Sequence, residues 1–142
     1  MPKLYFVGLG LDWKHLTLEA LEVINNVDKV YLENYTSISN TITLDFIRKI
    51  NRNTFTLTRK DLEDEEGKII IEDLSRGLNV ALAVIGDPFI ATTHIALRLK
   101  VEKLGFKTVV VNNNSILNVA ISISGLQLYR FGKSATIVYP KN

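Results

Sequence analysis

The chain has 142 residues, which predicts one domain with a core large enough to fold without disulfide bonds. Its sequence contains no cysteine, which excludes disulfides, thiolate metal ligands and a cysteine nucleophile, and its net charge of +2 argues against nucleic acid, which usually requires a basic face. No apolar run approaches the roughly 18 residues of a membrane span, and the segment after Lys3 lacks a signal-peptide layout, so we expect a cytoplasmic protein with no membrane partner.

The first part of the chain predicts strands that alternate with helices. Residues 3–7 form a short apolar run that ends in Gly8-Leu9-Gly10-Leu11, which is typical of a strand entering a glycine turn. Thr17 is placed to cap a helix that buries Leu18, Leu21, Val23, Ile24 and Val27. The predictions that follow are a strand at 29–33, a polar loop at 34–41, a helix at 44–50 and a strand at 54–57.

An acidic stretch at residues 61–66 precedes the next predicted helix. Ile69, Ile70 and Leu74 indicate that helix, although Gly67 would cost about 1 kcal/mol relative to alanine inside it. The acidic run contains no histidine or cysteine to define a metal site, so we interpret it as a solvated helix face.

Residues 80–85, Val-Ala-Leu-Ala-Val-Ile, predict a central parallel strand that is buried on both faces, because six apolar residues follow one another without alternation. Gly86 then allows a sharp turn, and Asp87 places a carboxylate just beyond the strand. Ligands of open parallel sheets bind beyond the carboxyl ends of the strands, so Asp87 marks the predicted site.

The helix after this turn is expected to be capped by Thr92 or Thr93 and to bury Ile95, Leu97 and Leu99. The remaining chain predicts a strand at 107–111, a helix at 116–123, a glycine-bounded segment at 125–132 and a last strand at 135–139. The alternation predicts an α/β fold: a single open, mainly parallel five-stranded sheet with helices on both faces and right-handed crossovers.

Gly8 and Gly10 supply only the first half of the G-x-G-x-x-G fingerprint of dinucleotide sites. Trp13 stands where the third glycine belongs and would crowd the approach of the helix to a pyrophosphate. A phosphate-rich ligand is therefore disfavoured. The two glycines either make a turn only or let a flat ligand lie on the backbone.

Asp87 has two interpretations. It caps the turn that follows it, or its lone pairs accept hydrogen bonds from ribose hydroxyls or from a cationic group of a ligand. Ser115 and Ile116 follow the strand at 107–111, so the two loops are expected to face each other across one ligand. His94 is interpreted as a surface or packing residue rather than a base, and no triad or carboxylate pair stands out.

Two further segments have open interpretations. Tyr35, Thr36 and Ser37 either form an ordinary turn or overhang the site and contact a substrate. The second segment, Tyr129 to Phe131, either binds a ligand by stacking and charge or packs against a neighbouring chain.

Four segments together resemble the diphthine synthase family, which is a tetrapyrrole methylase type of S-adenosylmethionine-dependent methyltransferase. They are residues 4–11, 35–37, 86–94 with the pattern G-D-P-x-x-A-T-T-H, and 125–134. The resemblance is collinear from Lys3 to Pro140, and residues 86–94 are its most specific part. It implies S-adenosylmethionine as cofactor, S-adenosylhomocysteine as product, and cofactor contacts from Leu11, Asp87, Ile90, Ser115 and Ile116.

The resemblance also implies a reaction and partners. In the family, the amino group of a modified histidine on translation elongation factor 2 is methylated during diphthamide biosynthesis, and the enzymes form homodimers. By this resemblance the turn after Leu11 is one residue shorter than in the family, and we expect residues 1–142 to lack the family's second α/β domain. Residues 1–142 are thus expected to be the cofactor-binding domain, either as a fragment, as a natural half-protein or as one partner of a split enzyme that has a separate C-terminal half.

Two other functions stay open at this point. One is a non-catalytic S-adenosylmethionine-binding module, or a half-enzyme that needs a partner chain. The other is an ordinary nucleotide-binding enzyme of Rossmann type, against which Trp13 argues.

Overall fold

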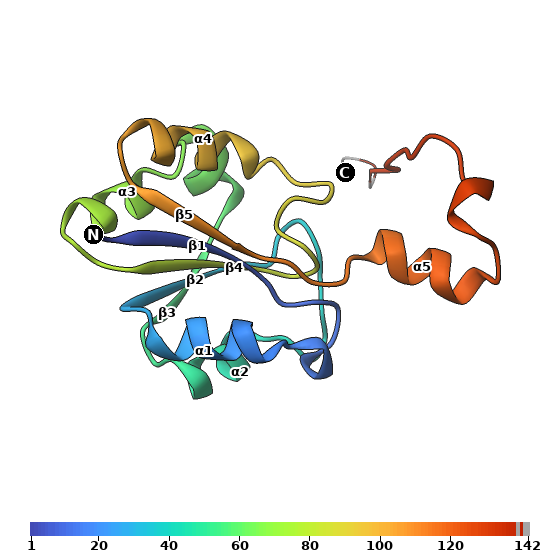
Figure 1. The fold of residues 1–142 in the computed structure, drawn as a ribbon, viewed down its shortest axis with the longest axis horizontal. Helices are drawn as coiled ribbons and strands as arrows, with labels where there is room; N and C mark the ends of the chain where they lie inside the picture. The colour runs from blue at the N-terminus through green and yellow to red at the C-terminus, as the bar shows by residue number, and fades with distance from the viewer. Residues whose placement is uncertain (139, 141–142) are drawn as a thin grey trace.

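The computed structural model describes residues 1–138 and 140. Its centre is a sheet of five parallel strands in the order β3-β2-β4-β1-β5 (Figure 1). The strands are β1 (Lys3–Gly8), β2 (Lys29–Glu33), β3 (Thr54–Leu57), β4 (Val80–Val84) and β5 (Lys107–Val111). The predicted α/β fold with a five-stranded parallel sheet is confirmed.

Helices cover both faces of the sheet. Figure 1 shows α1 (Leu18–Asn26) and α2 (Leu44–Ile50) on one face, with α3 (Lys68–Ser75) and α4 (Ile95–Lys103) on the other. The strand order explains this division. The chain moves toward one edge from β1 to β3 and toward the other edge from β3 to β5, and right-handed crossovers in opposite directions place helices on opposite faces.

β4 is the central strand that the sequence predicts. All five of its residues are buried, and it pairs in parallel with both β1 and β2. Val80, Leu82 and Val84 join the core under α3 and α4, whereas Ala81 and Ala83 join the core under α1 and α2. The absence of alternation in the sequence thus reflects two apolar layers, one on each face.

α1 begins as predicted but buries fewer residues than expected. The Thr17 side chain caps it by accepting a hydrogen bond from the Ala20 N–H at 3.0 Å. The buried residues of the helix are Ala20 and Ile24, while Leu18 is 86% exposed. The apolar residues of α1 therefore cover a wider part of the helix surface than the stripe that contacts the sheet.

The prediction for α4 is wrong in its cap and in its buried stripe. Thr92 Oγ1 donates to the Pro88 carbonyl and Thr93 Oγ1 to Glu63 Oε1, so neither hydroxyl caps the helix. Its buried residues are Leu97 and Val101, and Ile95 and Leu99 are at least half exposed. Residues four apart share a helix face, whereas residues two apart do not.

α3 forms, but Gly67 does not lie inside it. Residues Lys60–Asp64 form a short π-helical turn, and Gly67 has a φ of +69° in the N-cap position of α3. The left-handed backbone at Gly67 ends one turn and starts the next helix.

The last described part of the chain, residues 112–138, leaves the sheet as a C-terminal arm, drawn in orange to red in Figure 1. The arm contains α5 (Ile116–Ser124), none of whose residues is buried, and a 3-10 turn at Leu128–Arg130. The predicted strand at 135–139 is wrong for residues 135–138, which form no strand, and Tyr139 lies outside the described residues. Strands need a neighbouring edge to pair with, and Ile137 is 97% exposed.

In the part of the chain that the structure describes, no helix combines the length and the apolar character that a membrane span requires.

Candidate functional site

The carboxyl ends of β1, β4 and β5 lie side by side at one edge of the sheet. The segment after β1 leads to α1 on one face, and the segment after β4 leads to α4 on the other (Figure 1). A sheet reverses its winding at such a point, and this is where ligands of open α/β sheets bind.

Glycines let the loops at this edge approach one another. Gly10 and Gly86 exchange two backbone hydrogen bonds, at 3.2 and 2.8 Å, and both have a positive φ. A Cβ on Gly8 would lie 2.8 Å from Asn113 Cβ and 2.9 Å from the Gly86 carbonyl oxygen. The loops after β1, β4 and β5 therefore meet at a distance that side chains at these positions would prevent.

Asp87 fastens two of these loops together. The residue is 4% exposed, and its Oδ1 accepts a hydrogen bond from the Phe89 N–H at 2.9 Å. Its Oδ2 accepts from Asn112 Nδ2 and from the Asn113 N–H, both at 3.1 Å. The interpretation of Asp87 as a turn cap is confirmed. An ionised carboxylate oxygen can accept two hydrogen bonds, so Oδ1 keeps capacity for another donor.

The other predicted site residues lie in the same loops. The Leu11 N–H donates to His15 Nδ1 at 3.1 Å, and the Leu11 carbonyl accepts from Ser39 Oγ at 3.1 Å. Ser115 is 5% exposed, and its Cα lies 3.8 Å from the position of a Cβ built on Gly86. Ile90 and Ile116 are 38% and 66% exposed. The structure thus brings the loops of Leu11, Asp87 and Ser115 together and leaves the two isoleucines accessible.

The segment after the glycine turn differs from a dinucleotide site. Trp13 is 49% exposed and begins a 3-10 turn (Trp13–His15), and α1 starts only at Leu18. A pyrophosphate site needs a helix N-terminus directly after the turn, and here none follows. The reason is the path of the backbone rather than crowding by Trp13.

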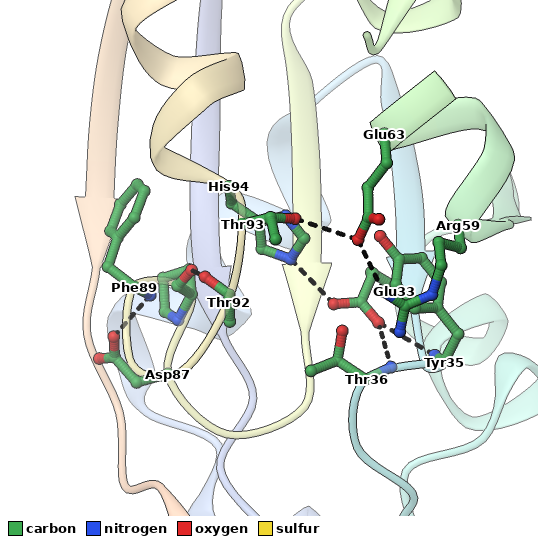
Figure 2. Close-up of polar contacts among 11 residues, drawn as sticks. Glu33, Tyr35, Thr36, Arg59, Glu63, Asp87, Phe89, Thr92, Thr93 and His94 are labelled. Atoms are coloured by element: carbon green, nitrogen blue, oxygen red, sulfur yellow. Dashed lines mark hydrogen bonds and ion pairs between the residues drawn. The ribbon is translucent and has the colours of Figure 1, made fainter. Parts of the chain in front are cut away.

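A buried pair of a histidine and a glutamate lies beside these loops, at the end of β2 (Figure 2). His94 Nε2 lies 2.8 Å from Glu33 Oε2, and their side chains are 2% and 0% exposed. Glu33 Oε1 accepts hydrogen bonds from the N–H groups of Tyr35 and Thr36, both at 2.9 Å. Burial raises the pKa of Glu33, but the hydrogen bonds from His94 and the Thr36 N–H outweigh it, and the pKa lies below its ordinary value.

Tyr35 extends this network. Arg59 lies over its ring, 5.0 Å from the centroid, and donates a hydrogen bond to Glu63 Oε1 at 2.9 Å. Burial, together with the charges of Glu33 and Glu63, raises the pKa of Tyr35 to about 12. Among the described residues, the Tyr35 hydroxyl is a buried polar atom without a hydrogen-bond partner. Tyr35 therefore packs against its neighbours, whereas Thr36 is exposed.

Sequence reasoning missed the partners of the two acids. Local sequence patterns link neither Asp87 with Asn112 and Asn113 nor Glu33 with His94. The signal for Glu33 is a charge directly after the apolar residues Val30, Tyr31 and Leu32, at the end of a strand whose residues from Val30 to Glu33 are all buried. A charge in that position needs a partner.

Tyr129, Arg130 and Phe131 do not join this site. They lie on the C-terminal arm, which points away from the sheet in Figure 1, and Tyr129 is 79% exposed. Within residues 1–138 and 140, no group of three or more His, Asp or Glu side chains could hold a metal ion.

Residues 3–142 match the family model of the Tetrapyrrole (Corrin/Porphyrin) Methylases. The chain is 43% identical over 141 residues to the diphthine synthase of Staphylothermus marinus, covering 97% of this chain and 52% of that protein. It is 43% identical over 142 residues to the diphthine synthase of Sulfurisphaera tokodaii, covering 100% of this chain and 56% of that protein.

A crystal structure of diphthine synthase has a similar fold, with a TM-score of 0.84 and 37% sequence identity over 92% of this chain and 51% of that one. The chain therefore spans about half the length of the curated relatives it matches.

Proposed function

The chain belongs to the tetrapyrrole methylases, and we propose on that basis that it is the S-adenosylmethionine-binding part of a cytoplasmic diphthine synthase. The observation that carries the proposal is the meeting of three loops around Asp87 at the carboxyl edge of the sheet. The family match covers residues 3–142 and supports the family, whereas the contacts around Asp87 support this edge as the proposed site.

The proposed cofactor contacts are Leu11, Asp87, Ile90, Ser115 and Ile116. Within the described residues, Asp87 Oδ1 accepts from the Phe89 N–H, and we propose that it also accepts a hydrogen bond from a ribose hydroxyl. Ile90 and Ile116 offer exposed apolar surface for the adenine ring. These roles fit a flat ligand between two turns.

The residues at this edge suit a cofactor without phosphate. A buried carboxylate would repel a phosphate group, and no helix begins at the glycine turn to attract one. The ordinary nucleotide-binding enzyme is therefore the weaker alternative.

S-adenosylmethionine, when bound, supplies a methyl group attached to a positively charged sulfur. Transfer to a neutral amine needs in-line approach and exclusion of water more than a strong base, so positioning would supply most of the catalysis. The residues of this chain would accordingly bind the cofactor and orient it toward the amine. The proposed acceptor is the amino group of the modified histidine on elongation factor 2, and Tyr35 to Ser37 are proposed to contact that protein.

The C-terminal arm supports further partners. Its exposed apolar side chains need to be covered, and the two proposed occupants are a second copy of the chain in a homodimer and a C-terminal half of the kind that the longer relatives contain. The most exposed are Ile116, Ile123, Leu126, Leu128, Tyr129, Ile137 and Val138.

The test is calorimetric binding of S-adenosylmethionine, S-adenosylhomocysteine and NAD to the full chain. We expect the first two to bind and NAD not to bind. The variant Asp87→Asn should weaken binding by about tenfold, because the asparagine amide keeps only one acceptor oxygen. Its NH2 group either takes the place of Oδ1 and removes the proposed ribose acceptor, or takes the place of Oδ2 and faces the donors of Asn112 and Asn113. Alanine is unsuitable at this position, because it would leave three donors without their acceptor and disturb the turn.

Asp45→Asn is the matched control, because it makes the same acid-to-amide change at an exposed position on α2, outside the loops after β1, β4 and β5. Unchanged affinity in Asp87→Asn would remove Asp87 from the site, and tighter binding of NAD would favour the nucleotide-binding enzyme. Binding of S-adenosylmethionine without methyl transfer to elongation factor 2 would favour the non-catalytic module, or a half-enzyme that needs its partner chain.

A further inference from the structure

The segment from Asp87 to His94 is fastened at both ends. At its start, Asp87 accepts hydrogen bonds from Asn112 and Asn113, which tie the segment to the loop after β5. At its end, His94 pairs with Glu33 at the end of β2. Figure 2 shows these two ends, with Thr92 and Thr93 between them.

The backbone between the two ends is held in an unfavourable conformation. Ala91 has a φ of +56°, a left-handed value that residues with a Cβ rarely adopt. Thr92 Oγ1 donates to the Pro88 carbonyl at 2.5 Å, which closes the segment on itself. Such a conformation persists only when its surroundings hold it in place.

Packing alone does not hold this segment. A cavity of about 520 Å³ borders it on the side of α4, and its lining includes Leu62, Glu63, Thr93, His94 and Leu97. Thr93 borders this cavity, and its hydrogen bond to Glu63 Oε1 is exposed, so the buried polar contact at the end of the segment is the pair between His94 and Glu33.

Glu33 restrains a second loop with its other oxygen. Oε1 accepts hydrogen bonds from the Tyr35 and Thr36 N–H groups, so one carboxylate holds both the proposed substrate loop and the proposed cofactor loop. We propose that Glu33 and His94 are positioning residues: their buried pair sets the conformation of residues 87–93 and couples that segment to residues 35–36. The link to catalysis rests on the proposed function, whereas the link between the two loops does not.

The pair also fixes the hydrogen on the His94 ring. An ionised carboxylate only accepts hydrogen bonds, so Nε2 must carry the hydrogen that lies between the two residues. The lowered pKa of Glu33 agrees with an ionised carboxylate at neutral pH. A glutamine at position 94 can present its amide N–H close to the place of Nε2, whereas a leucine cannot.

The test compares His94→Gln with His94→Leu in the full chain, labelled with nitrogen-15. In His94→Leu we expect the amide resonances of both loops to move, namely those of Tyr35 and Thr36 and those of Phe89 to Thr92. In His94→Gln they should stay close to the wild-type positions. Leu74→Ala is the matched control, because Leu74 is 1% exposed on α3, outside both loops, and its truncation lowers stability.

Binding of S-adenosylhomocysteine gives the second readout. We expect affinity to fall by about tenfold in His94→Leu, to stay within about threefold in His94→Gln, and to be unchanged in Leu74→Ala. If the wild-type chain does not bind this ligand, the proposed function fails, and the amide resonances still decide whether the pair couples the loops.

Three results would overturn the inference. The first is that the resonances of Phe89 to Thr92 do not move in His94→Leu. The second is that the loop resonances and the affinity change as much in His94→Gln as in His94→Leu. The third applies even if His94→Leu does not fold: ring-nitrogen shifts of the wild-type protein that place the hydrogen of a neutral His94 on Nδ1 alone.

Discussion

Tyr31 and Tyr35 place their hydroxyl groups in opposite environments. The Tyr31 hydroxyl donates to Asp73 Oδ2 at 2.5 Å, whereas the Tyr35 hydroxyl, within the described residues, is buried without a partner. Burial raises the pKa of both, and the hydrogen bond to Asp73 raises that of Tyr31 further. The two residues therefore allow a matched comparison of a satisfied and an unsatisfied hydroxyl.

We predict that Tyr35→Phe increases the free energy of unfolding by about 1 kcal/mol, because a buried hydroxyl without a partner costs about 1–3 kcal/mol. Tyr31→Phe should decrease it by about 1–3 kcal/mol, because Asp73 then loses a donor. Urea unfolding of the two variants measures both values. A loss of stability in Tyr35→Phe would show that the hydroxyl has a partner in solution.

At the scale of the element, Gly67 decides where α3 starts. It has a φ of +69°, and a Cβ there would lie 2.5 Å from Leu97 Cδ1, on α4. A helix running through residue 67 would instead place it at a negative φ, where alanine is preferred over glycine. The two arrangements therefore predict opposite signs for the change in the free energy of unfolding in Gly67→Ala.

Gly67→Ala is predicted to lower the free energy of unfolding by about 1–2 kcal/mol, from left-handed strain and displacement of the Leu97 side chain. Gly77→Ala is the control for strain alone, because its φ is +87° and nothing lies within 4 Å of a Cβ there. Gly77→Ala should lower the free energy of unfolding by less than Gly67→Ala does. Thermal unfolding ranks the two variants, and a Gly67→Ala protein that is more stable by about 1 kcal/mol would mean that the helix continues through residue 67.

At the scale of the whole molecule, the sheet domain and the C-terminal arm differ in their cores. β4 is fully buried between two helical layers, whereas α5 buries none of its residues. An apolar helix without a core cannot be stabilised by its own side chains, because most helical stability in proteins comes from packing. The arm is therefore expected to associate with another surface.

If a second copy covers the arm, the double variant Leu117→Glu with Ile123→Glu should weaken dimerisation by at least about tenfold, because charges would enter an apolar contact. Leu18→Glu is the control, since Leu18 is also exposed but lies on α1. Light scattering over a range of concentrations measures the association. A wild-type chain that stays monomeric throughout contradicts the homodimer.

Much of the fold follows from local patterns in the sequence. The unbroken apolar run at residues 80–85 predicts a strand buried on both faces, and Thr17 predicts a helix start, because strand burial and N-capping depend on residues that are close in the chain. Asp87 is recognisable for the same reason, since it directly follows the strand and the glycine that place it.

Tertiary structure alone decided which side chains meet. Glu33 and His94 are separated by 61 positions in the chain, and Asp87 and Asn113 by 26, so no local pattern links either pair. They come together because β2, β4, β1 and β5 are neighbours in the sheet although they are not consecutive in the sequence. The sequence by itself thus determined the five strands of the sheet and Asp87 after one of them, and the order of those strands determined the partners of Asp87 and Glu33.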